Sequence, residues 1–269
     1  MLLQVWRWMP GRRLVVVADG TYAVLDFLLK VSRLPLLSVI TRLRLDACLY
    51  DPAPVREVGK RGRHALKGKA QPKLAQRLND PATQWQKQTL SWYGGTTREM
   101  EIATGTALWY QSPIPPVAIR WVLIRDPEGR YEPMARLGTD QDTEALQIVE
   151  WFVLRWTVEV TFHEVRAHLG VETQRQWSDL AILRTTPALL ALFSLVTIFA
   201  HQLLGERPFP IRQAAWYSKT LPTFSDTLAF VRQHLWPSTF FSVSSRDGDT
   251  VQIPRALFDR LVDTLAFAA

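Results

Sequence analysis

Two acidic residues of this sequence, Asp19 and Glu159, stand where a carboxylate could take part in chemistry. Asp19 directly follows the apolar run LVVVA at 14–18, and Glu159 lies between Arg155 and Arg166 in VEWFVLRWTVEVTFHEVRAHLG. Carboxylates that converge from a strand and a helix can hold two Mg²⁺ ions about 3.5–4 Å apart, which activate water for phosphodiester cleavage. Arginines beside them bind phosphates. These residue types suggest metal-dependent phosphodiester cleavage, with Asp19 and Glu159 as metal ligands.

The segment 149–170 is predicted to be one helix, and its periodicity groups the charged residues. At roughly 100° per residue, Phe152, Arg155, Glu159 and Arg166 share one narrow stripe. The large apolar side chains on the other side form a separate packing face: Trp151, Leu154, Val158 and Val165. An Arg–Glu–Arg ladder on a solvated surface is the ordinary interpretation of such a stripe. A site for an anionic substrate is the alternative, because charged groups on an apolar helix are costly without partners.

The elements around Asp19 are predicted to form a β–α–β unit. The β-branched run at 14–18 indicates a strand covered on both faces, residues 22–31 have helical periodicity, and residues 36–45 indicate a second strand. The crossover helix makes the two strands parallel, so Asp19 lies at the carboxyl end of a parallel strand. In open α/β sheets, active sites lie at that end.

The chain of 269 residues carries a net charge of +7 and has an isoelectric point near 9.8, which favours a polyanionic partner such as nucleic acid. Six Lys or Arg fall within the fifteen residues of GKRGRHALKGKAQPK at 59–73. Five of these are proposed as DNA contacts: Lys60, Arg61, Arg63, Lys67 and Lys69. Charge alone leaves two interpretations of this basic segment open, a solvated loop or an arm that contacts phosphates.

Other features of the sequence favour a cytoplasmic location without membrane contact. The single cysteine, Cys48, excludes an internal disulfide framework and suits a reducing compartment. The N-terminal MLLQVWRWMPGRR lacks the cleavage site of a signal peptide. The longest apolar run, 188–200, has thirteen residues. That is short of the roughly 20 that a membrane span needs, so this run predicts a buried helix.

Strands and then helices are predicted beyond the basic segment. The strand-like segments are 88–95, 101–111, 118–126 and 130–138. The helical segments are 143–168, 176–183, 187–204, 223–236 and 254–267. Asp126-Pro-Glu-Gly129 is typical of a hairpin turn, so Asp126 is interpreted as a turn residue and not as a metal ligand.

Two stretches of the sequence resemble one known family. The spacing Phe152-x2-Arg155-x3-Glu159-x6-Arg166 is similar to the Tyr-x2-Arg-x3-Glu-x6-Lys signature of bacterial insertion-sequence transposases, which are DDE enzymes with a ribonuclease-H-like fold. VVVADGTYAVLDFL resembles the family's second-aspartate segment, with Asp19 and Tyr22 at the matching positions. The strand-rich block between the two acids resembles the β-rich insertion that this branch of the family carries.

The resemblance implies an α/β, ribonuclease-H-like fold that is incomplete at its N-terminus, with a β-rich insertion and a helical C-terminal region. The expected parts are the second half of the sheet (1–50), the insertion with the basic arm (51–140), the signature helix with its packing helices (141–205) and the C-terminal helices (206–269). The family's first aspartate has no counterpart, because only eighteen residues precede Asp19 and none is acidic. The sequence is therefore expected to be the C-terminal portion of a transposase, with the strand at 14–18 on an open sheet edge.

The resemblance also implies an activity and a set of partners. Mg²⁺, or Mn²⁺ as a substitute, would bind Asp19 and Glu159, with a two-ion site only where the missing aspartate is supplied. The further DNA contacts would be Phe152, Arg155, Arg166 and Tyr22. The substrates would be double-stranded transposon ends and target DNA, cleaved and joined by a nucleoid-associated bacterial protein. Because one catalytic aspartate is missing, the chain is expected to be inactive alone. It would act as a homo-oligomer or in mixed assembly with an intact transposase. A catalytically dead DNA-binding remnant that inhibits an intact transposase remains the alternative.

We predict that the basic segment contributes to DNA affinity. Replacing Lys60, Arg61, Arg63, Lys67 and Lys69 by Gln should weaken binding of a labelled duplex. For every phosphate that the variant no longer neutralises, the salt dependence of log K should also decrease by about 0.9. Fluorescence anisotropy at several salt concentrations measures both quantities. An unchanged affinity would show that the segment is a solvated loop.

Overall fold

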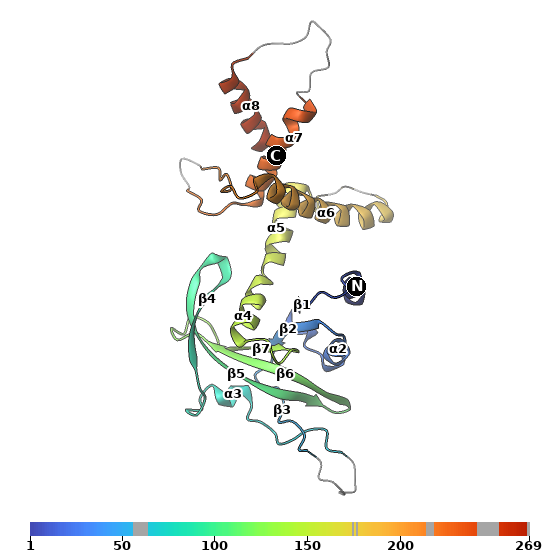
Figure 1. Ribbon diagram of the computed structural model, residues 1–269, viewed down its shortest axis with the longest axis vertical. Coiled ribbons are helices and arrows are strands. Elements are labelled where there is room, and N and C mark those ends of the chain that lie inside the picture. The colour runs from blue at the N-terminus through green and yellow to red at the C-terminus, as the bar shows by residue number, and fades with distance from the viewer. Residues whose placement is uncertain (56–63, 174, 176, 214–217, 241–252, 268–269) are drawn as a thin grey trace. The chain divides into compact units, whose positions relative to one another are not determined.

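The computed structural model describes residues 1–269 apart from 56–63, 174, 176, 214–217, 241–252 and 268–269. The chain divides into two units, 1–157 and 158–269, and each is described by itself. The first unit contains the β-sheet with its covering helices, and the second is helical in its described part (Figure 1). This mixed α/β architecture agrees with the predicted fold class.

A seven-stranded sheet organises the described part of the first unit (Figure 1). Its strands are β1 (Leu14–Val17), β2 (Leu37–Leu43), β3 (Leu49–Tyr50), β4 (Gln86–Ser91), β5 (Thr97–Gln111), β6 (Ile114–Arg125) and β7 (Met134–Gly138). Their order is β1-β2-β7-β6-β5-β3, and β4 also pairs with β5. β1 and β2 are parallel, and the other pairs are antiparallel. Because β7 pairs with β2, the predicted insertion strands continue the sheet that β1 and β2 begin.

The predicted β–α–β unit is confirmed. After β1, a 3-10 turn η1 (Gly20–Tyr22) leads into α2 (Leu25–Val31), and β2 then returns parallel to β1. The side chains of Leu25, Leu28 and Val31 are buried, because a spacing of three residues keeps them on one face of the helix. A short helix, α1 (Leu2–Trp8), is joined to the loop between α2 and β2 by a hydrogen bond from Trp6 Nε1 to the carbonyl of Pro35 at 3.0 Å.

The two faces of the sheet carry two separate hydrophobic cores. One face, here called the α2 face, packs Leu28, Val39 and Leu137 beneath α2. The other, the α4 face, packs strand residues such as Ile40 and Val122 beneath α4 (Ala145–Leu154). In β1, Leu14 and Val16 contact the first core whereas Val15 and Val17 contact the second. β1 is thus covered on both faces as predicted, although it lies at one end of the described sheet and its residues are only half-buried.

The predicted continuous helix over 143–168 is wrong. α4 ends at Leu154, residues 155 and 156 form a turn, and α5 (Thr157–Leu169) begins a new helix. In the turn the amides of Arg155 and Trp156 bond to carbonyls three residues back, at 3.2 and 3.1 Å. The Thr157 hydroxyl donates to the carbonyl of Leu154 at 2.8 Å. A side chain therefore competes for a carbonyl that would accept a backbone amide in a continuous helix. The stripe from Phe152 to Arg166 therefore does not lie on one helix.

The helical second unit contains α6 (Asp179–Leu204), α7 (Phe224–Phe240) and α8 (Arg255–Phe267). A small core joins α6 and α7 through Val196 and Ala200 of α6 and Phe230 of α7, and the rings of Phe193 and Phe224 stack at 4.4 Å. The sequence predicted two helices here, at 176–183 and 187–204, but α6 passes through Pro187 without a break. Proline costs one backbone hydrogen bond, but its fixed φ is compatible with a helix, and the Ala- and Leu-rich flanks favour one.

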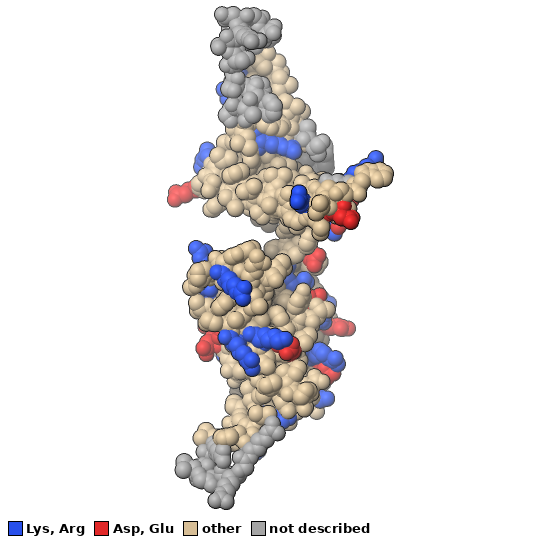
Figure 2. All heavy atoms as spheres, turned by 90° about the vertical axis from the view of Figure 1, so that its right-hand side faces the viewer, with Lys and Arg blue, Asp and Glu red and all other residues tan. Residues whose placement is uncertain are grey.

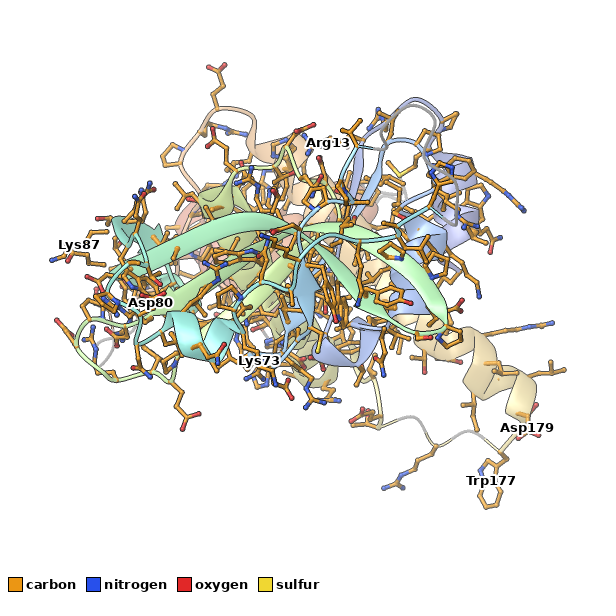
Figure 3. The ribbon with its side chains drawn as sticks, turned by 90° about the horizontal axis from the view of Figure 1, so that it is seen from below. Arg13, Lys73, Asp80, Lys87, Trp177 and Asp179 are labelled. Carbon is orange, nitrogen blue, oxygen red and sulfur yellow. The ribbon has the colours of Figure 1, made fainter. Side chains whose placement is uncertain are left out.

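The prediction that the apolar run at 188–200 is a buried helix is also wrong. Of the α6 residues, only Val196 and Ala200 are buried within the described part of the chain. Large apolar side chains along α6 are exposed: Leu180, Ile182, Leu183, Leu192, Leu195, Ile198 and Phe199. By length and composition α6 could cross a membrane, a test that a core helix of a soluble protein also passes. Just before α6, the fully exposed Trp177 projects outward near Asp179 (Figure 3).

The docking of α4 on the sheet depends on Ile148, which is fully buried and faces the glycine of β7, Gly138. A Cβ at Gly138 would lie 3.0 Å from Ile148 Cδ1, so the contact is close. We predict that Ile148→Ala lowers the free energy of unfolding by about 2–5 kcal/mol, because it leaves a cavity in the core. Leu154→Ala on the same helix, where the side chain is 58% exposed, should change it by less than about 0.5 kcal/mol. Urea unfolding followed by tryptophan fluorescence measures both, and equal effects would contradict this packing.

Candidate functional site

Asp19 lies at the carboxyl end of β1, as predicted. The amide of Ala18 still donates to Ile40 of β2 at 2.9 Å, and Asp19 itself keeps an extended backbone before the chain turns into η1. The Thr41 hydroxyl donates to the carbonyl of Asp19 at 2.7 Å, and the Gly20 amide donates to its carboxylate at 2.6 Å. The carboxylate is exposed, and its backbone is held to the neighbouring strand.

The strand register aligns Asp19 with two arginines. Val17 pairs with Ile40 in the parallel ladder, so the same register continued by two residues sets Asp19 level with Arg42. Arg42 in turn is the antiparallel partner of Arg136 on β7. Because side chains alternate along a strand and Ile40 packs on the α4 face, Arg42 and Arg136 belong to that face. We call Asp19, Arg42 and Arg136 the carboxyl-end row.

Arg136 is a buried cation whose contacts are neutral groups. It is 5% exposed, and its guanidinium lies 3.9 Å from the centre of the Phe152 ring. It donates to the carbonyl of Ala135 at 3.1 Å and to Met134 Sδ at 3.0 Å. Burial lowers the pKa of Arg136 to about 10; the Tyr93 hydroxyl opposes this shift, and the charges of Arg42 and Arg155 add to it. Arg136 therefore keeps its charge at neutral pH.

The predicted DNA contacts at the end of α4 have different surroundings. Phe152 is 6% exposed and forms part of the core on the α4 face, so its ring supports Arg136. Arg155 is half-buried at the end of the helix, with its guanidinium 5.8 Å from the Phe152 ring. The charge of Arg155 thus adds to the positive charge around Arg136. The Phe152 ring lies against the guanidinium groups of both arginines.

Glu159 and Arg166 lie on α5, in the second unit, whereas Asp19 lies in the first. Glu159 is exposed. Arg166 forms a two-pronged pair with Glu172, with Nε 2.7 Å and Nη2 2.9 Å from the two carboxylate oxygens. Since the two units are described separately, the convergence of Glu159 with Asp19 stays a prediction.

The remaining predicted DNA contacts are spread over the first unit. Tyr22 is 54% exposed in η1, with its ring centre 5.9 Å from that of Phe27. Lys67 is half-buried, and its ammonium lies 3.4 Å and 4.4 Å from the ring centres of Tyr50 and Tyr110. Such contacts give Lys67 a structural role. Lys69 is exposed. Three predicted contacts fall outside the described residues: Lys60, Arg61 and Arg63.

A cleft of about 500 Å³ opens at the carboxyl ends of β1 and β2. Gly20, Arg42, Trp109, Glu132 and Met134 are among the residues that line it. Figure 2 shows basic side chains across the middle of one side of the first unit, with acidic ones mostly toward its margins. We call the cleft at the ends of β1 and β2 the carboxyl-end cleft. It lies where α/β proteins bind their ligands.

The tryptophans of the sheet belong to the core. Trp92 and Trp121 are buried, and Trp85 and Trp109 pack in part against the core on the α2 face. The guanidinium of Arg125 lies 4.0 Å from the centre of the Trp85 ring. The high tryptophan content of the sequence is thus accounted for largely by packing in this unit.

The described residues do not by themselves complete a metal site. No group of three or more His, Cys, Asp or Glu gathers in the part of the chain that the structure describes. Asp19 has the chemistry that Mg²⁺ prefers, but one of its oxygens already accepts the Gly20 amide and its row is otherwise cationic. A metal centre here needs carboxylates beyond those that the first unit places at the carboxyl-end row.

Arg42 and Arg136 were missed in the sequence. Both stand in strand segments where the alternation of apolar and polar residues indicates only that they face away from Leu43 or Leu137. Their importance depends on the pairing of β2 with β7, two strands separated by about ninety residues of chain. A local pattern does not carry that information.

Comparison with protein families matches residues 1–99 to the family described as DDE superfamily endonuclease. The matched stretch includes β1, Asp19, α2 and β2, and it ends before Glu159. A comparison with curated proteins found no match. The family match supports a DDE transposase-like domain, with DNA as the substrate class. Endonucleases of this superfamily generally use divalent metal ions.

The hairpin turn predicted at Asp126 is confirmed. The Gly129 amide donates to the Asp126 carbonyl at 3.1 Å, and the buried carboxylate accepts the amides of Glu128 and Arg130, both at 3.0 Å. Burial is the largest influence on the pKa of Asp126 and raises it, but the hydrogen bonds from Glu128 and Arg130 together outweigh burial and lower the pKa. Asp126 is a structural residue of the turn.

We predict that Asp126→Asn destabilises the fold in a pH-dependent way. A carboxyl with a lowered folded-state pKa stabilises the fold above its unfolded-state pKa of about 3.9, and this contribution is lost as the pH falls through the folded-state value. The difference in unfolding free energy between wild type and Asp126→Asn should thus be full at neutral pH and shrink below about pH 4. Glu128→Gln, in the same turn but exposed, is the matched control. If Asp126→Asn lost metal-dependent cleavage while its unfolding free energy stayed unchanged, Asp126 would instead have a catalytic role.

Proposed function

We propose that the chain is a DDE-type transposase of a bacterial insertion sequence, which cleaves and transfers DNA strands at transposon ends. The observation that carries the proposal is the position of Asp19. It follows a parallel strand within the stretch that matches DDE endonucleases, beside a cleft lined by Arg42 and Arg44 together with Asp46 and Glu132. In such a site a carboxylate meets the phosphodiester that arginines hold.

Asp19 and Glu159 are the proposed ligands of Mg²⁺, for which Mn²⁺ would substitute. When bound, the ion would supply activation of water and stabilisation of the leaving oxygen. Arg155 and Arg166 would orient phosphates; Arg166 would then have to exchange its pair with Glu172 for the DNA. Double-stranded DNA is the proposed partner, and the protein would act as an oligomer associated with the nucleoid.

A second function is favoured by a separate observation. The described residues bring no three metal-binding side chains together, yet they align Arg42 and Arg136 beside Asp19. On this alternative, the exposed Arg42 and the buried charge of Arg136 would attract DNA, and no cleavage would follow. The protein would inhibit an intact transposase by entering its assemblies.

We predict that Asp19→Asn and Glu159→Gln each reduce Mg²⁺-dependent nicking of a labelled transposon-end duplex by about a hundredfold or more. A metal ligand supplies several kcal/mol of transition-state stabilisation, and each 1.36 kcal/mol is about tenfold in rate. DNA affinity should remain, because neither residue binds phosphate directly. The assay uses a version of the protein that carries the upstream region with the family's first aspartate.

Matched controls separate chemistry from folding. Asp26→Asn removes an exposed carboxylate of α2 that pairs with Lys30, and Glu164→Gln removes a half-buried carboxylate of α5 that lies 3.4 Å from His168. Both should keep wild-type cleavage. Cleavage that survives Glu159→Gln would overturn the transposase proposal. DNA binding with no cleavage in Mg²⁺ or Mn²⁺ would favour the second function.

A further inference from the structure

Arg42 and Arg136 form an uncompensated pair of like charges. They face each other in the β2–β7 register, and like charges directly opposite on a sheet destabilise it. Other arginines of the unit have carboxylate partners, including Arg44 with Asp46 and Arg125 with Glu101, both at 2.6 Å. Among the described residues, no ion pair involves Arg42 or Arg136.

The burial of Arg136 makes this arrangement costly. A buried charge is tolerated mainly when a counter-charge and full hydrogen bonding accompany it. Arg136 instead contacts a carbonyl, a thioether, a phenol and the ring of Phe152. These groups hold the guanidinium in place but leave its charge uncancelled. A buried cation of this kind creates a strong positive potential at the nearest exposed surface.

One exposed surface close to Arg136 is that of its strand partner Arg42, which lines the carboxyl-end cleft. Arg42 is exposed and lines the cleft together with Gly20. A Cβ built on Gly20 would lie 3.5 Å from Arg42 Cβ, so the loop after Asp19 passes directly over this arginine. An anion in the cleft would meet an exposed guanidinium, with a second one buried across the strand pair.

We propose that Arg42, supported by the buried charge of Arg136, binds a phosphate group in the carboxyl-end cleft beside Asp19. The guanidinium of Arg42 matches two oxygens of one phosphate, and the bound phosphate supplies the missing counter-charge. A DNA backbone and a free phosphate share this chemistry. The choice of DNA as the source rests on the proposed function.

The first test compares Arg42→Gln with wild type in binding a labelled duplex by fluorescence anisotropy. The variant should bind about tenfold more weakly, and the slope of log K against log salt should be less steep by about 0.9, the value for one phosphate contact. Arg33→Gln removes an exposed arginine that follows α2 and should keep the wild-type slope. An equal affinity and slope in wild type and Arg42→Gln would overturn the inference while leaving the proposed function intact.

The second test uses Arg136→Met, which removes the buried charge and keeps an apolar side chain of similar length. Affinity for the duplex should fall several-fold, whereas the melting temperature should stay the same or rise, because an apolar side chain in place of an uncompensated buried charge is often stabilising. A lower melting temperature with unchanged affinity would show that Arg136 serves the fold alone.

A third test distinguishes a DNA backbone from a free phosphate as the ligand of the site. Inorganic pyrophosphate should raise the melting temperature of wild type and not that of Arg42→Gln. If wild type responds to pyrophosphate but does not bind DNA, the proposed function fails while the phosphate site stands. If wild type binds neither DNA nor pyrophosphate, the phosphate site is overturned as well.

Discussion

The pairing of β2 with two different neighbours is the constraint on which the first unit depends. β2 runs parallel to β1 and antiparallel to β7, so it joins the β–α–β unit to the meander of β5, β6 and β7. A shift of one residue in either register would move Arg42 to the opposite face. The register as found sets Asp19, Arg42 and Arg136 in one row at the edge of a cleft.

The helix α4 covers the face of the sheet on which Arg42 and Arg136 lie. Ile148 and Phe152 fill the core beneath it, and the same Phe152 ring carries the guanidinium of Arg136. Apolar packing therefore fixes the position of a charge, because the ring cannot move without opening the core. The position of the Arg136 charge therefore depends on how α4 packs against the sheet.

The sequence predicted local features well and long-range ones poorly. The apolar run at 14–18, the helix after it and the turn at Asp126 depend on neighbours in the chain, so periodicity and turn chemistry were sufficient. The periodicity of 149–170 did not reveal the turn at Arg155 and Trp156, because the Thr157 hydroxyl competes with the backbone there. Proline at 187 suggested a helix boundary, yet a surface position tolerates it within α6. The role of Arg136 follows only from the pairing of β7 with β2, which lies far from it in the sequence.

The charge of the carboxyl-end row bears on how Asp19 can work. As long as no anion lies beside Arg42 and Arg136, their positive charges oppose any cation at the Asp19 carboxylate. A phosphate at Arg42 would cancel much of that charge and leave the carboxylate as the dominant local group. On this proposal, Asp19 would bind a cation only weakly until a DNA backbone lies beside Arg42. The further carboxylate that such a site needs must come from outside the row, which is the role that we propose for Glu159 on α5.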